Sequence, residues 1–595
     1  MSGAAQAATA VVAQSLRMLF AREREAPVCA LDDVSLEARH GELTALVGPD
    51  GAGKTTLMRL AAGLLRASGG SLTVLGIDVA AHPQQVQDRI SYMPQRFGLY
   101  EDMSVAENLD LYADLHGVTA AERALRYPQL MEMTALGPFK TRLAGQLSGG
   151  MKQKLGLACT LVRSPELLLL DEPTVGVDPL SRRELWEIVT RLVAEQGLTV
   201  LLSTAYLDEA ERCSRVIMLH RGQVLLQGSP QQVADTAAGR SFVATPSPGQ
   251  SASALQARLL DQPDIIDAVP DGGRVRFVRD TPDQASAPPG TGLGALPDLA
   301  IQPVPPRFED GFMMLLRSRS ERESAQTLEI AHPLARRREE AVVRVQQLVK
   351  QFGTFTAVDH ISFEVRFGEI FGLLGPNGAG KTTTFRMLCG LLGPSGGDLQ
   401  VAGADVRHSP ASARARLGYV AQKFSLYGPL SVSENLEFFA SAYGLRGERR
   451  RSRIAWAMEQ FELGAHARTT SAQLPGGFKQ RLAMAAALLH EPELLFLDEA
   501  TSGADPQARR AFWRRITGLA EQGVTVIVTT HFMPEAEYCD RIAIMDAGKI
   551  LAQGSPAQVR ELARTRELPE PSMDDAFIAL VAQTRRRNGA APAAA

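Results

Sequence analysis

Short apolar runs that end in charged or glycine-rich residues recur along the chain and predict the buried strands of a parallel sheet. Leu167–Leu170 forms one such run and ends at Asp171, and Leu494–Leu497 forms another and ends at Asp498. Continuous apolar runs of this length are typical of strands that helices cover on both faces. The longest runs fall short of the roughly 18 residues that a membrane-spanning helix needs, so we expect no span in this chain.

The same pattern occurs twice. Gly48–Thr56 reappears as Gly375–Thr383, and residues 30–36 reappear as residues 357–363, in each case 327 positions later. The offset holds over more than 120 residues, which chance similarity does not produce, so the sequence predicts two homologous domains. The predicted division is a first domain at 11–235, an extension with a linker at 236–316, a charged connector at 317–342, a second domain at 343–560, and a closing helix with a tail at 561–595.

The segment between the two domains is rich in Pro, Gly, Ser and Ala and carries one patch with signals of ordered structure. Ser253–Leu260 predicts a helix with Ser253 as its N-cap, and Ile265–Val269 with Val275–Val278 predicts a hairpin. Each domain also closes with a short helix that opens with acidic residues, as the helix dipole favours. We expect these helices at 306–315 and 571–580, a loop at 285–295, a charged connector at 316–340 and a solvated tail at 585–595.

Composition narrows the classes of function. The chain has 63 Lys and Arg against 66 Asp and Glu, a net charge of −3. A protein held on nucleic acid by phosphate contacts would carry a basic excess, so we expect no nucleic-acid partner. The five cysteines include no CxxC pair, which leaves neither a disulfide framework nor an iron–sulfur ligand set.

Two glycine-rich loops carry the candidate chemistry. In each half a predicted strand leads into Gly-x4-Gly-Lys-Thr and then into a helix. The glycines let backbone N–H groups surround phosphates at a helix N-terminus. Lys54 and Lys381 would neutralise the phosphates of ATP, and Thr55 and Thr382 would give hydroxyls to Mg²⁺. The predicted nucleotide-binding residues of the two loops are Gly48, Pro49, Asp50, Gly51, Ala52, Gly53, Lys54, Thr55 and Thr56, and Gly375, Pro376, Asn377, Gly378, Ala379, Gly380, Lys381, Thr382 and Thr383.

A pair of acids follows each loop at the end of an apolar strand. Asp171-Glu172 and Asp498-Glu499 both lie 117 residues after the lysine of their own loop. The strand would place the aspartate beside Mg²⁺, and the next residue would turn towards the γ-phosphate. Glu172 and Glu499 are therefore candidate bases that polarise the attacking water, an effect worth about 10²–10⁴ in rate.

A further segment, Leu147-Ser148-Gly149-Gly150, precedes a predicted helix and resembles the signature motif of ATP-binding-cassette (ABC) ATPases. This resemblance implies an α/β fold with two tandem P-loop NTPase domains. Each would have a helical subdomain, an antiparallel β subdomain and a short C-terminal αβ extension. It also implies that two ATP molecules are sandwiched head to tail, each between the P-loop of one domain and the signature loop of the other.

Other motif positions fit the same family. Gln95 and Gln422 match its Q-loop, Asp178 and Asp505 end segments that resemble its D-loop, and His531 matches its switch histidine. Phe20 and Phe352 lie where the family places an aromatic that stacks on adenine, although strand packing explains Phe20 equally well. The resemblance implies Glu172, Glu499 and His531 as catalytic residues; Thr55, Gln95, Asp171, Thr382, Gln422 and Asp498 around Mg²⁺; and Ser148, Gly149, Gly150, Gly476, Gly477 and Phe352 as further ATP contacts.

The halves differ at two motif positions. Ala205 stands where the second half has His531, and Pro475 stands where the first half has Ser148. Proline offers neither a hydroxyl nor an N–H, and each loss alone would cost ~1–3 kcal/mol of transition-state stabilisation. In a head-to-tail sandwich both departures fall in one composite site. We therefore predict pairing within one chain, with one hydrolytic site and one that mostly holds ATP; turnover at both sites is the alternative, because Glu172 is retained.

Tandem ABC ATPases without membrane spans act in several settings. Those that act on the ribosome typically carry a long charged helical linker, and that function stays open here as the alternative. Tyr206–Cys213 and the closing helices resemble ATPases that drive ABC-2-type exporters, in particular the fused two-domain subunits of bacterial multidrug exporters. The resemblance implies efflux of a substrate, drugs being candidates, through two separate integral-membrane permease subunits. The chain would then lie peripherally at the cytoplasmic face of the bacterial inner membrane.

In this family the region after the Q-loop receives a helix of the membrane subunit. Tyr100 and Tyr427 occupy that region in the two halves, so we expect an interface there. Core packing alone explains the neighbouring Leu99 and Leu426.

Overall fold

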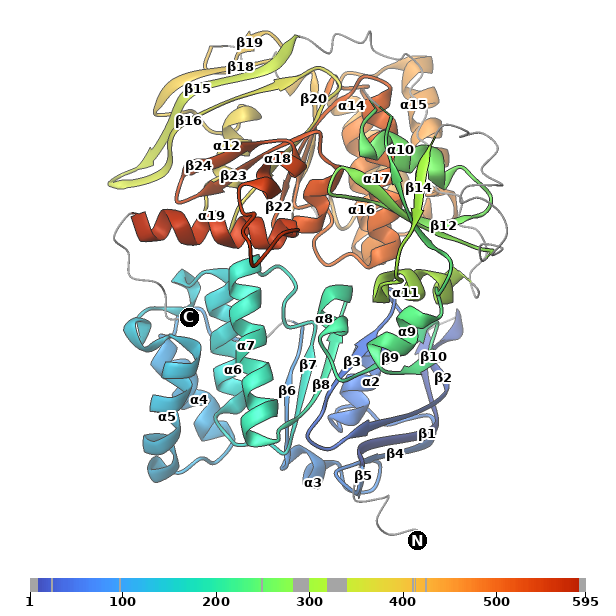
Figure 1. Ribbon diagram of the computed structural model, residues 1–595, viewed down its shortest axis with the longest axis vertical. Coiled ribbons are helices and arrows are strands. Elements are labelled where there is room, and N and C mark those ends of the chain that lie inside the picture. Colours follow the sequence, from blue (N-terminus) through green and yellow to red (C-terminus); the bar gives the residue numbers. More distant parts are fainter. Residues whose placement is uncertain are drawn as a thin grey trace.

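The computed structural model describes residues 9–22, 25–95, 98–247, 250–281, 299–317, 340–408, 411, 414–422 and 425–587. Within these residues, no helix is both long and apolar enough to cross a membrane. The loop expected at 285–295, most of the connector expected at 316–340 and the tail beyond residue 587 lie outside them. The two halves lie one above the other in Figure 1, the first blue to teal and the second yellow to red.

The centre of the first half is a six-stranded sheet in the order β10-β9-β3-β8-β7-β6, parallel except for β10. The apolar run that predicted a buried strand is β7, and all five of its residues are buried. The carboxyl ends of β3, β7 and β8 meet at one edge, where α/β sheets bind ligands. The strands are β3 (Leu43–Val47), β6 (Ile90–Met93), β7 (Leu167–Asp171), β8 (Thr199–Thr204), β9 (Arg215–His220) and β10 (Gln223–Gly228).

A second, antiparallel sheet in the order β2-β1-β4-β5 packs with α2 against the first sheet. It contains β1 (Thr9–Arg22), β2 (Glu25–Arg39), β4 (Gly69–Val74) and β5 (Ile77–Asp78). The helices and short turns of this half are α2 (Lys54–Ala61), α3 (Pro83–Gln87), α4 (Val105–Leu115), α5 (Ala120–Thr134), η1 (Gly137–Phe139), η2 (Ala144–Gln146), α6 (Gly149–Leu161), α7 (Pro179–Gln196), α8 (Leu207–Glu211) and α9 (Pro230–Asp235).

The helical subdomain consists of α4, α5 and α6. Capping boxes fix the starts of α4 and α5, in which Ser104 pairs with Glu107 and Thr119 with Glu122. Asn108, fully buried in α4, exchanges hydrogen bonds with the backbone of Tyr100 and so fixes the loop that follows the Q-loop.

The second half repeats both sheets, in the orders β20-β21-β22-β17-β23-β24 and β16-β15-β18-β19. Its strands are β15 (Ala341–Phe352), β16 (Phe355–Arg366), β17 (Ile370–Leu374), β18 (Gly396–Val401), β19 (Ala404–Asp405), β20 (Leu417–Val420), β21 (Leu494–Asp498), β22 (Thr525–Thr530), β23 (Arg541–Asp546) and β24 (Lys549–Gly554). Its helices and turns are α12 (Lys381–Leu388), α14 (Val432–Ala442), α15 (Gly447–Gln460), η3 (Gly464–His466), η4 (Ser471–Gln473), α16 (Gly476–Leu488), α17 (Pro506–Glu521), η5 (Met533–Tyr538), α18 (Pro556–Glu561) and α19 (Met573–Arg587).

An extension of residues 241–281 and 299–317 follows the first half. Its antiparallel sheet has the order β12-β13-β11-β14, with the expected hairpin at its edge. Its elements are β11 (Ser241–Thr245), α10 (Ala252–Leu260), β12 (Ile265–Asp271), β13 (Arg274–Arg279), β14 (Ala300–Pro303) and α11 (Phe308–Arg317). The N-cap of α10 is Ser251 and not Ser253, because the Ser251 hydroxyl accepts the N–H of Ala254.

The two closing helices form where acidic residues predicted them, as α11 and α19. The expectation of an αβ extension after each half holds for the first half only. Among the described residues after 554, the second half continues with α18 and α19 and with no strand.

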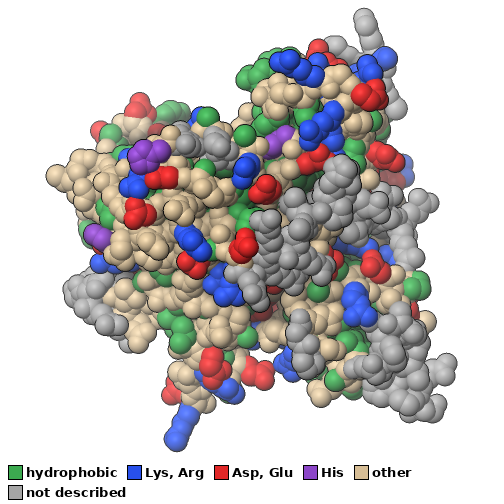
Figure 2. Space-filling model, turned by 90° about the horizontal axis from the view of Figure 1, so that it is seen from above, with side chains coloured by type: hydrophobic (Ala, Val, Ile, Leu, Met, Phe, Trp, Pro, Cys, Tyr) green, Lys and Arg blue, Asp and Glu red, His purple; other side chains and the backbone are tan. Residues whose placement is uncertain are grey.

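Charged side chains of both signs are interspersed on the face that Figure 2 shows. This distribution agrees with the near balance of 63 basic and 66 acidic residues in the chain.

Candidate functional site

Each P-loop joins the end of a central strand to the start of a helix. Gly53 takes a left-handed backbone (φ 105°), and a Cβ there would lie 2.7 Å from the carbonyl oxygen of Ala30. Gly380 repeats this geometry, with φ 98° and 2.5 Å to the carbonyl oxygen of Ala357. Only glycine fits either position without a clash. The glycine therefore lets the loop lead directly into the start of the helix, where free backbone N–H groups lie.

The P-loop lysines are buried and point back into their own loops. Lys54 Nζ donates to the carbonyl oxygens of Gly48 (2.7 Å) and Pro49 (3.1 Å). Lys381 Nζ makes the same two bonds in the second half, at 2.7 and 3.0 Å. Each buried ammonium group lies at the start of a helix, where free backbone N–H groups suit the phosphates of a nucleotide, and we call this arrangement a cradle.

The acid pairs lie beside these cradles. Asp171 accepts hydrogen bonds from Ser203 (2.6 Å) and from Thr55 (3.2 Å). In the second half, Asp498 accepts a hydrogen bond of 2.6 Å from Thr529. The hydroxyl of Thr55 and the carboxylate of Asp171 thus converge, and such oxygen atoms are the ligands that Mg²⁺ prefers. The structure therefore brings two of the predicted metal ligands together.

The glutamates turn out of their strands on strained backbone. Glu172 and Glu499 have φ values of 50° and 47°, in the left-handed region that non-glycine residues seldom adopt. Each carboxylate accepts a 2.6 Å hydrogen bond from a Q-loop amide, Gln95 in the first half and Gln422 in the second. The predicted metal ligands Gln95 and Gln422 therefore give their amide N–H groups to the glutamates.

The two sites differ in the surroundings of these glutamates. In the second half, His531 Nδ1 lies 3.1 Å from Glu499 Oε2 and Lys381 Nζ lies 3.8 Å from Glu499 Oε1. In the first half, Lys54 Nζ lies 3.9 Å from Glu172 Oε1, and Ala205 offers no polar side-chain atom.

These surroundings shift the two carboxyl groups in opposite directions. Burial raises the pKa of Glu172 to about 7, against the attraction of Lys54 and with repulsion from Asp50 and Asp171. Burial also acts on Glu499, but His531, Lys381 and Gln422 together outweigh it and hold the pKa of that carboxyl below its ordinary value. Glu499 is therefore ionised at neutral pH, whereas Glu172 is partly protonated.

The halves pair head to tail within the chain. The N–H of Asp50, in the first P-loop, donates to Asp505 Oδ2 of the second half at 2.9 Å. The amide of Asn377, in the second P-loop, donates to the carbonyl oxygen of Gly176 in the first half at 3.1 Å. Each P-loop is thus tied to the D-loop of the other half.

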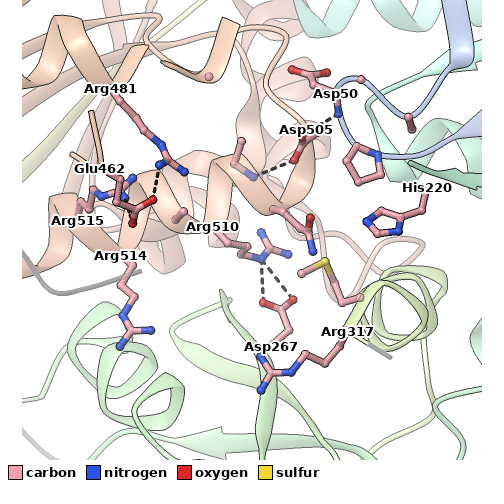
Figure 3. A pocket seen from close by; sticks show the side chains of 18 of the residues that line it. Asp50, His220, Asp267, Arg317, Glu462, Arg481, Asp505, Arg510, Arg514 and Arg515 are labelled. Atoms are coloured by element: carbon pink, nitrogen blue, oxygen red, sulfur yellow. Dashed lines mark hydrogen bonds and ion pairs between the residues drawn. The ribbon is translucent and has the colours of Figure 1, made fainter. Parts of the chain in front are cut away.

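The signature loops complete the two composite sites. A Cβ on Gly149 would lie 3.1 Å from Asn377 Nδ2, so the loop that begins at Ser148 faces the second P-loop. A cavity of about 620 Å³ lies between the first P-loop and the Pro475 loop, with Asp505 on its wall (Figure 3). We call the site of Lys54 and Pro475 the degenerate site and the site of Lys381 and Ser148 the consensus site.

The two signature helices start at equivalent residues with different caps. Ser148 caps α6 by accepting the N–H of Met151 at 3.3 Å. Pro475 occupies the same position before α16 and makes no side-chain cap. The fold of the loop survives the substitution, and what is lost at the degenerate site is a hydroxyl.

The structure also shows a contact between the halves that the motifs do not predict. Tyr206 and Phe532, each one residue after the switch position of its half, pack with their ring centroids 5.1 Å apart. The guanidinium groups of Arg182 and Arg509 lie over this pair, within 6 Å of both rings. The two arginines are equivalent in the sequence repeat, and so are the two aromatic residues. A comparison of the two halves could therefore have pointed to these residues, although the motif positions did not.

The two P-loops also differ at one position that was not predicted to matter: the first has Asp50 where the second has Asn377. Burial and the neighbouring Asp505 raise the pKa of Asp50 above its ordinary value. The degenerate site thus holds one more carboxyl group than the consensus site.

The candidate adenine-stacking aromatics lie on the antiparallel sheets. Phe352 is at the end of β15 and is 49% exposed, with Lys350 Nζ 5.1 Å from its ring centroid. Phe20 is 38% exposed. Both rings are accessible to a ligand.

Comparison with known proteins identifies the family. The sequence model of the ABC transporter family matches residues 31–175 and 358–502. The "Probable multidrug ABC transporter ATP-binding protein YbhF" of Escherichia coli is 50% identical over 558 residues, 93% of this chain and 95% of that protein. The chain belongs to the ATP-binding proteins of ABC transporters. It is an ATPase with two tandem ATP-binding domains.

Shorter members of the family align with one half. The "Nod factor export ATP-binding protein I" of Ralstonia nicotianae is 43% identical over 219 residues, 37% of this chain and 68% of that protein. A solved ATP-binding subunit of an ABC transporter is 28% identical, with a TM-score of 0.38, and the match covers 40% of this chain and 99% of that one.

The opposite pKa shifts predict opposite effects of two matched substitutions on the stability of the nucleotide-free protein. Because Glu172 binds its proton more tightly when folded, its contribution to wild-type stability falls as pH rises from about 4.5 to about 7. Glu172→Gln should remove this loss and gain up to ~3 kcal/mol relative to wild type above pH 7. Glu499, with its lowered pKa, stabilises the fold above its unfolded-state pKa, so Glu499→Gln should lose stability at neutral pH and approach wild type in acid.

Thermal unfolding of both variants and of wild type at pH 5 and pH 8 measures these effects. The same sign and the same pH profile for the two variants would contradict the described electrostatics.

Proposed function

We propose that the chain is the ATP-hydrolysing subunit of an export complex, with hydrolysis at the consensus site and retention of ATP at the degenerate site. The observation that supports this proposal is the head-to-tail pairing of the halves, since in such a pairing Ala205 and Pro475 would belong to the same composite site. Had the two substitutions fallen in different sites, both sites would have been impaired.

At the consensus site, Glu499 is the proposed base. Its lowered pKa keeps the carboxylate ionised and able to accept a hydrogen bond from the attacking water. Gln422, Lys381 and His531 hold its two oxygens, and Ser148 would bring a hydroxyl to the γ-phosphate from the other half.

At the degenerate site, Glu172 would be a poorer base. It is partly protonated near pH 7, it has no switch histidine beside it, and the opposite signature loop has Pro475 in place of a serine. The P-loop cradle is intact, so binding of ATP should persist there while turnover is slow.

We further propose that Mg²⁺ accompanies ATP at both sites. Thr55 with Asp171, and Thr382 with Asp498, would hold the ion together with phosphate oxygens. The ion would neutralise charge on the phosphates, while the chain's own residues bind the nucleotide and position the water.

The proposed partners are two integral-membrane permeases of the ABC-2 type, with the chain bound peripherally at the cytoplasmic face of the bacterial inner membrane. Near the two Q-loops, the Tyr100 side chain is 52% exposed and Tyr427 is 48% exposed. Tyr427 packs on Phe438, itself 43% exposed, with ring centroids 4.7 Å apart. Leu99 and Leu426 pack against their own cores, which leaves the exposed aromatic rings for a partner.

The names of two relatives favour export over other ABC functions. One is named as a probable multidrug transporter protein and the other as a Nod factor export protein. Both are bacterial ATP-binding proteins, so we place the chain in a bacterial efflux system whose cargo is selected by the permeases.

Replacement of each glutamate by glutamine tests the division of labour between the sites. Glu499→Gln should lower kcat for ATP hydrolysis by 100-fold or more, because the attacking water loses its base. Glu172→Gln, the matched control at the other site, should keep at least half of the wild-type rate. An equal loss in both variants would contradict the asymmetric assignment.

Cell fractionation tests the proposed location. The chain should sediment with membranes and be released with two permease subunits by mild detergent. Tyr427→Asp should weaken this association, because it puts a charge into an apolar contact. Sedimentation with ribosomes, unaffected by detergent, would contradict the export function and favour a role in translation.

A further inference from the structure

The extension is anchored firmly in the first half. Helix α11 supplies Phe308, Phe312 and Leu316 to the apolar core of that half. It also lies so close to α9 that a Cβ on Gly311 would come within 1.8 Å of the carbonyl oxygen of Val233. The extension therefore moves with the first half.

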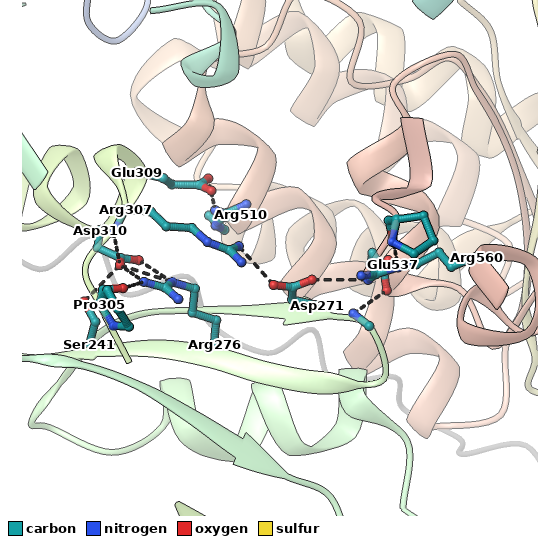
Figure 4. A network of polar contacts seen from close by, with 12 residues as sticks. Ser241, Asp271, Arg276, Pro305, Arg307, Glu309, Asp310, Arg510, Glu537 and Arg560 are labelled. Carbon is teal, nitrogen blue, oxygen red and sulfur yellow. Dashed lines mark hydrogen bonds and ion pairs between the residues drawn. The ribbon is translucent and has the colours of Figure 1, made fainter. Parts of the chain in front are cut away.

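The same extension binds α17 of the second half through ion pairs. Arg510 lies between Asp267 and Glu309 of the extension, with 3.2 Å to Asp267 Oδ1 (Figures 3 and 4). Four residues further along α17, Arg514 donates to Asp261 at 2.6 Å. The Arg510 and Asp267 side chains are only 13% and 7% exposed, so water screens this ion pair weakly.

A second tie joins the hairpin of the extension to the end of the second half. Arg560 donates to Asp271 at 3.2 Å and to Glu537 at 3.0 Å (Figure 4). The N–H of Gly272 donates to Glu537 at 3.0 Å. The extension thus contacts α17 and α18 through ion pairs and η5 through a backbone hydrogen bond.

These ties act directly on the degenerate site. The D-loop residue Asp505 is the N-cap of α17 and also accepts the N–H of Asp50 in the first P-loop. Holding α17 against the extension therefore holds Asp505 against that P-loop.

The sequence repeat provides an internal comparison on the other side. The counterparts of Arg510 and Arg514 in α7 are Arg183 and Glu187, which pair with each other along their own helix at 3.2 Å. There, α7 is tied to α19 by the pair Arg182–Asp574 at 3.4 Å. In the described part of the chain, no sheet equivalent to that of the extension follows the second half, so none contacts α7.

We infer that the extension is a clasp that keeps the degenerate side of the sandwich closed while the consensus side opens and closes in each cycle. Arg510, Asp267, Arg514 and Asp261 are then positioning residues that act through Asp505. This inference rests on the proposed function, because it explains how ATP stays bound at one site while products leave the other.

A disulfide across the clasp tests whether it opens during turnover. A Cβ on Gly273 would lie 3.9 Å from the Cβ of Ala557, within the range of a disulfide. The pair Gly273→Cys and Ala557→Cys is made with Cys29→Ser, which removes the exposed native thiol. Since Gly273 has a left-handed backbone (φ +79°), the reduced double variant is the reference.

The oxidised protein should keep at least half of the ATPase rate of its reduced form. A fall below half that a reductant reverses would overturn the inference, because it would show that the clasp must open. This result is separate from the glutamate test: equal loss in Glu172→Gln and Glu499→Gln would remove the asymmetry of hydrolysis but would not change what the cross-link reports.

Spin-label distances test the same inference without a cross-link. One pair, Arg258→Cys on α10 with Gln558→Cys on α18, spans the clasp. The other, Arg183→Cys on α7 with Ala579→Cys on α19, spans the consensus side. Both are compared between nucleotide-free protein and ATP-bound protein carrying Glu499→Gln.

We expect the consensus-side distance to change and the clasp distance to stay constant. Equal movement of both pairs, movement of the clasp pair alone, or no movement of either would overturn the inference. In protein labelled at positions 258 and 558, Arg510→Ala should allow the clasp distance to change when ATP binds. The matched variant Arg183→Ala should leave that distance constant.

Discussion

Neither P-loop forms a complete site by itself, and this constraint governs the whole molecule. The backbone of Asp50 and the side chain of Asn377 are both bonded to the D-loop of the opposite half. The loop that begins at Ser148 in the first half likewise faces the second P-loop. Each ATP would therefore lie between the halves, and whatever moves one half relative to the other would act on both nucleotides.

Fusion of the halves allows the two sites to diverge under this constraint. Two identical chains would place equal residues in both sites, whereas a single chain can gather Ala205 and Pro475 in one of them. The structure shows what the divergence does to the electrostatics, since the carboxyl of Glu499 is held ionised and that of Glu172 has its pKa raised to about 7. Tyr206, next to Ala205, packs on Phe532, next to His531.

Much of this architecture could be predicted from the sequence. The repeat fixed two domains, and the apolar run of β7 and the P-loop glycines predicted the strands and turns that carry the chemistry. These signals are local, because strand periodicity and the left-handed backbone at Gly53 depend on neighbouring residues. Contacts between residues hundreds of positions apart could not be predicted in this way. Nothing in the sequence near Arg510 indicates that Asp267 and Glu309 will surround it. The αβ extension was expected twice because the closing helices are similar, but the sheet itself is built from strands of residues 241–279 and 300–303 and has no counterpart among the described residues of the second half.

The nucleotide content of the trapped protein tests the central claim most directly. Vanadate in place of the γ-phosphate locks ADP into a site that hydrolyses ATP, and the protein can then be separated from free nucleotide and its contents counted. If one site hydrolyses ATP and the other retains it, the trapped protein should contain one ADP and one ATP per chain. Two ADP per chain would contradict the account.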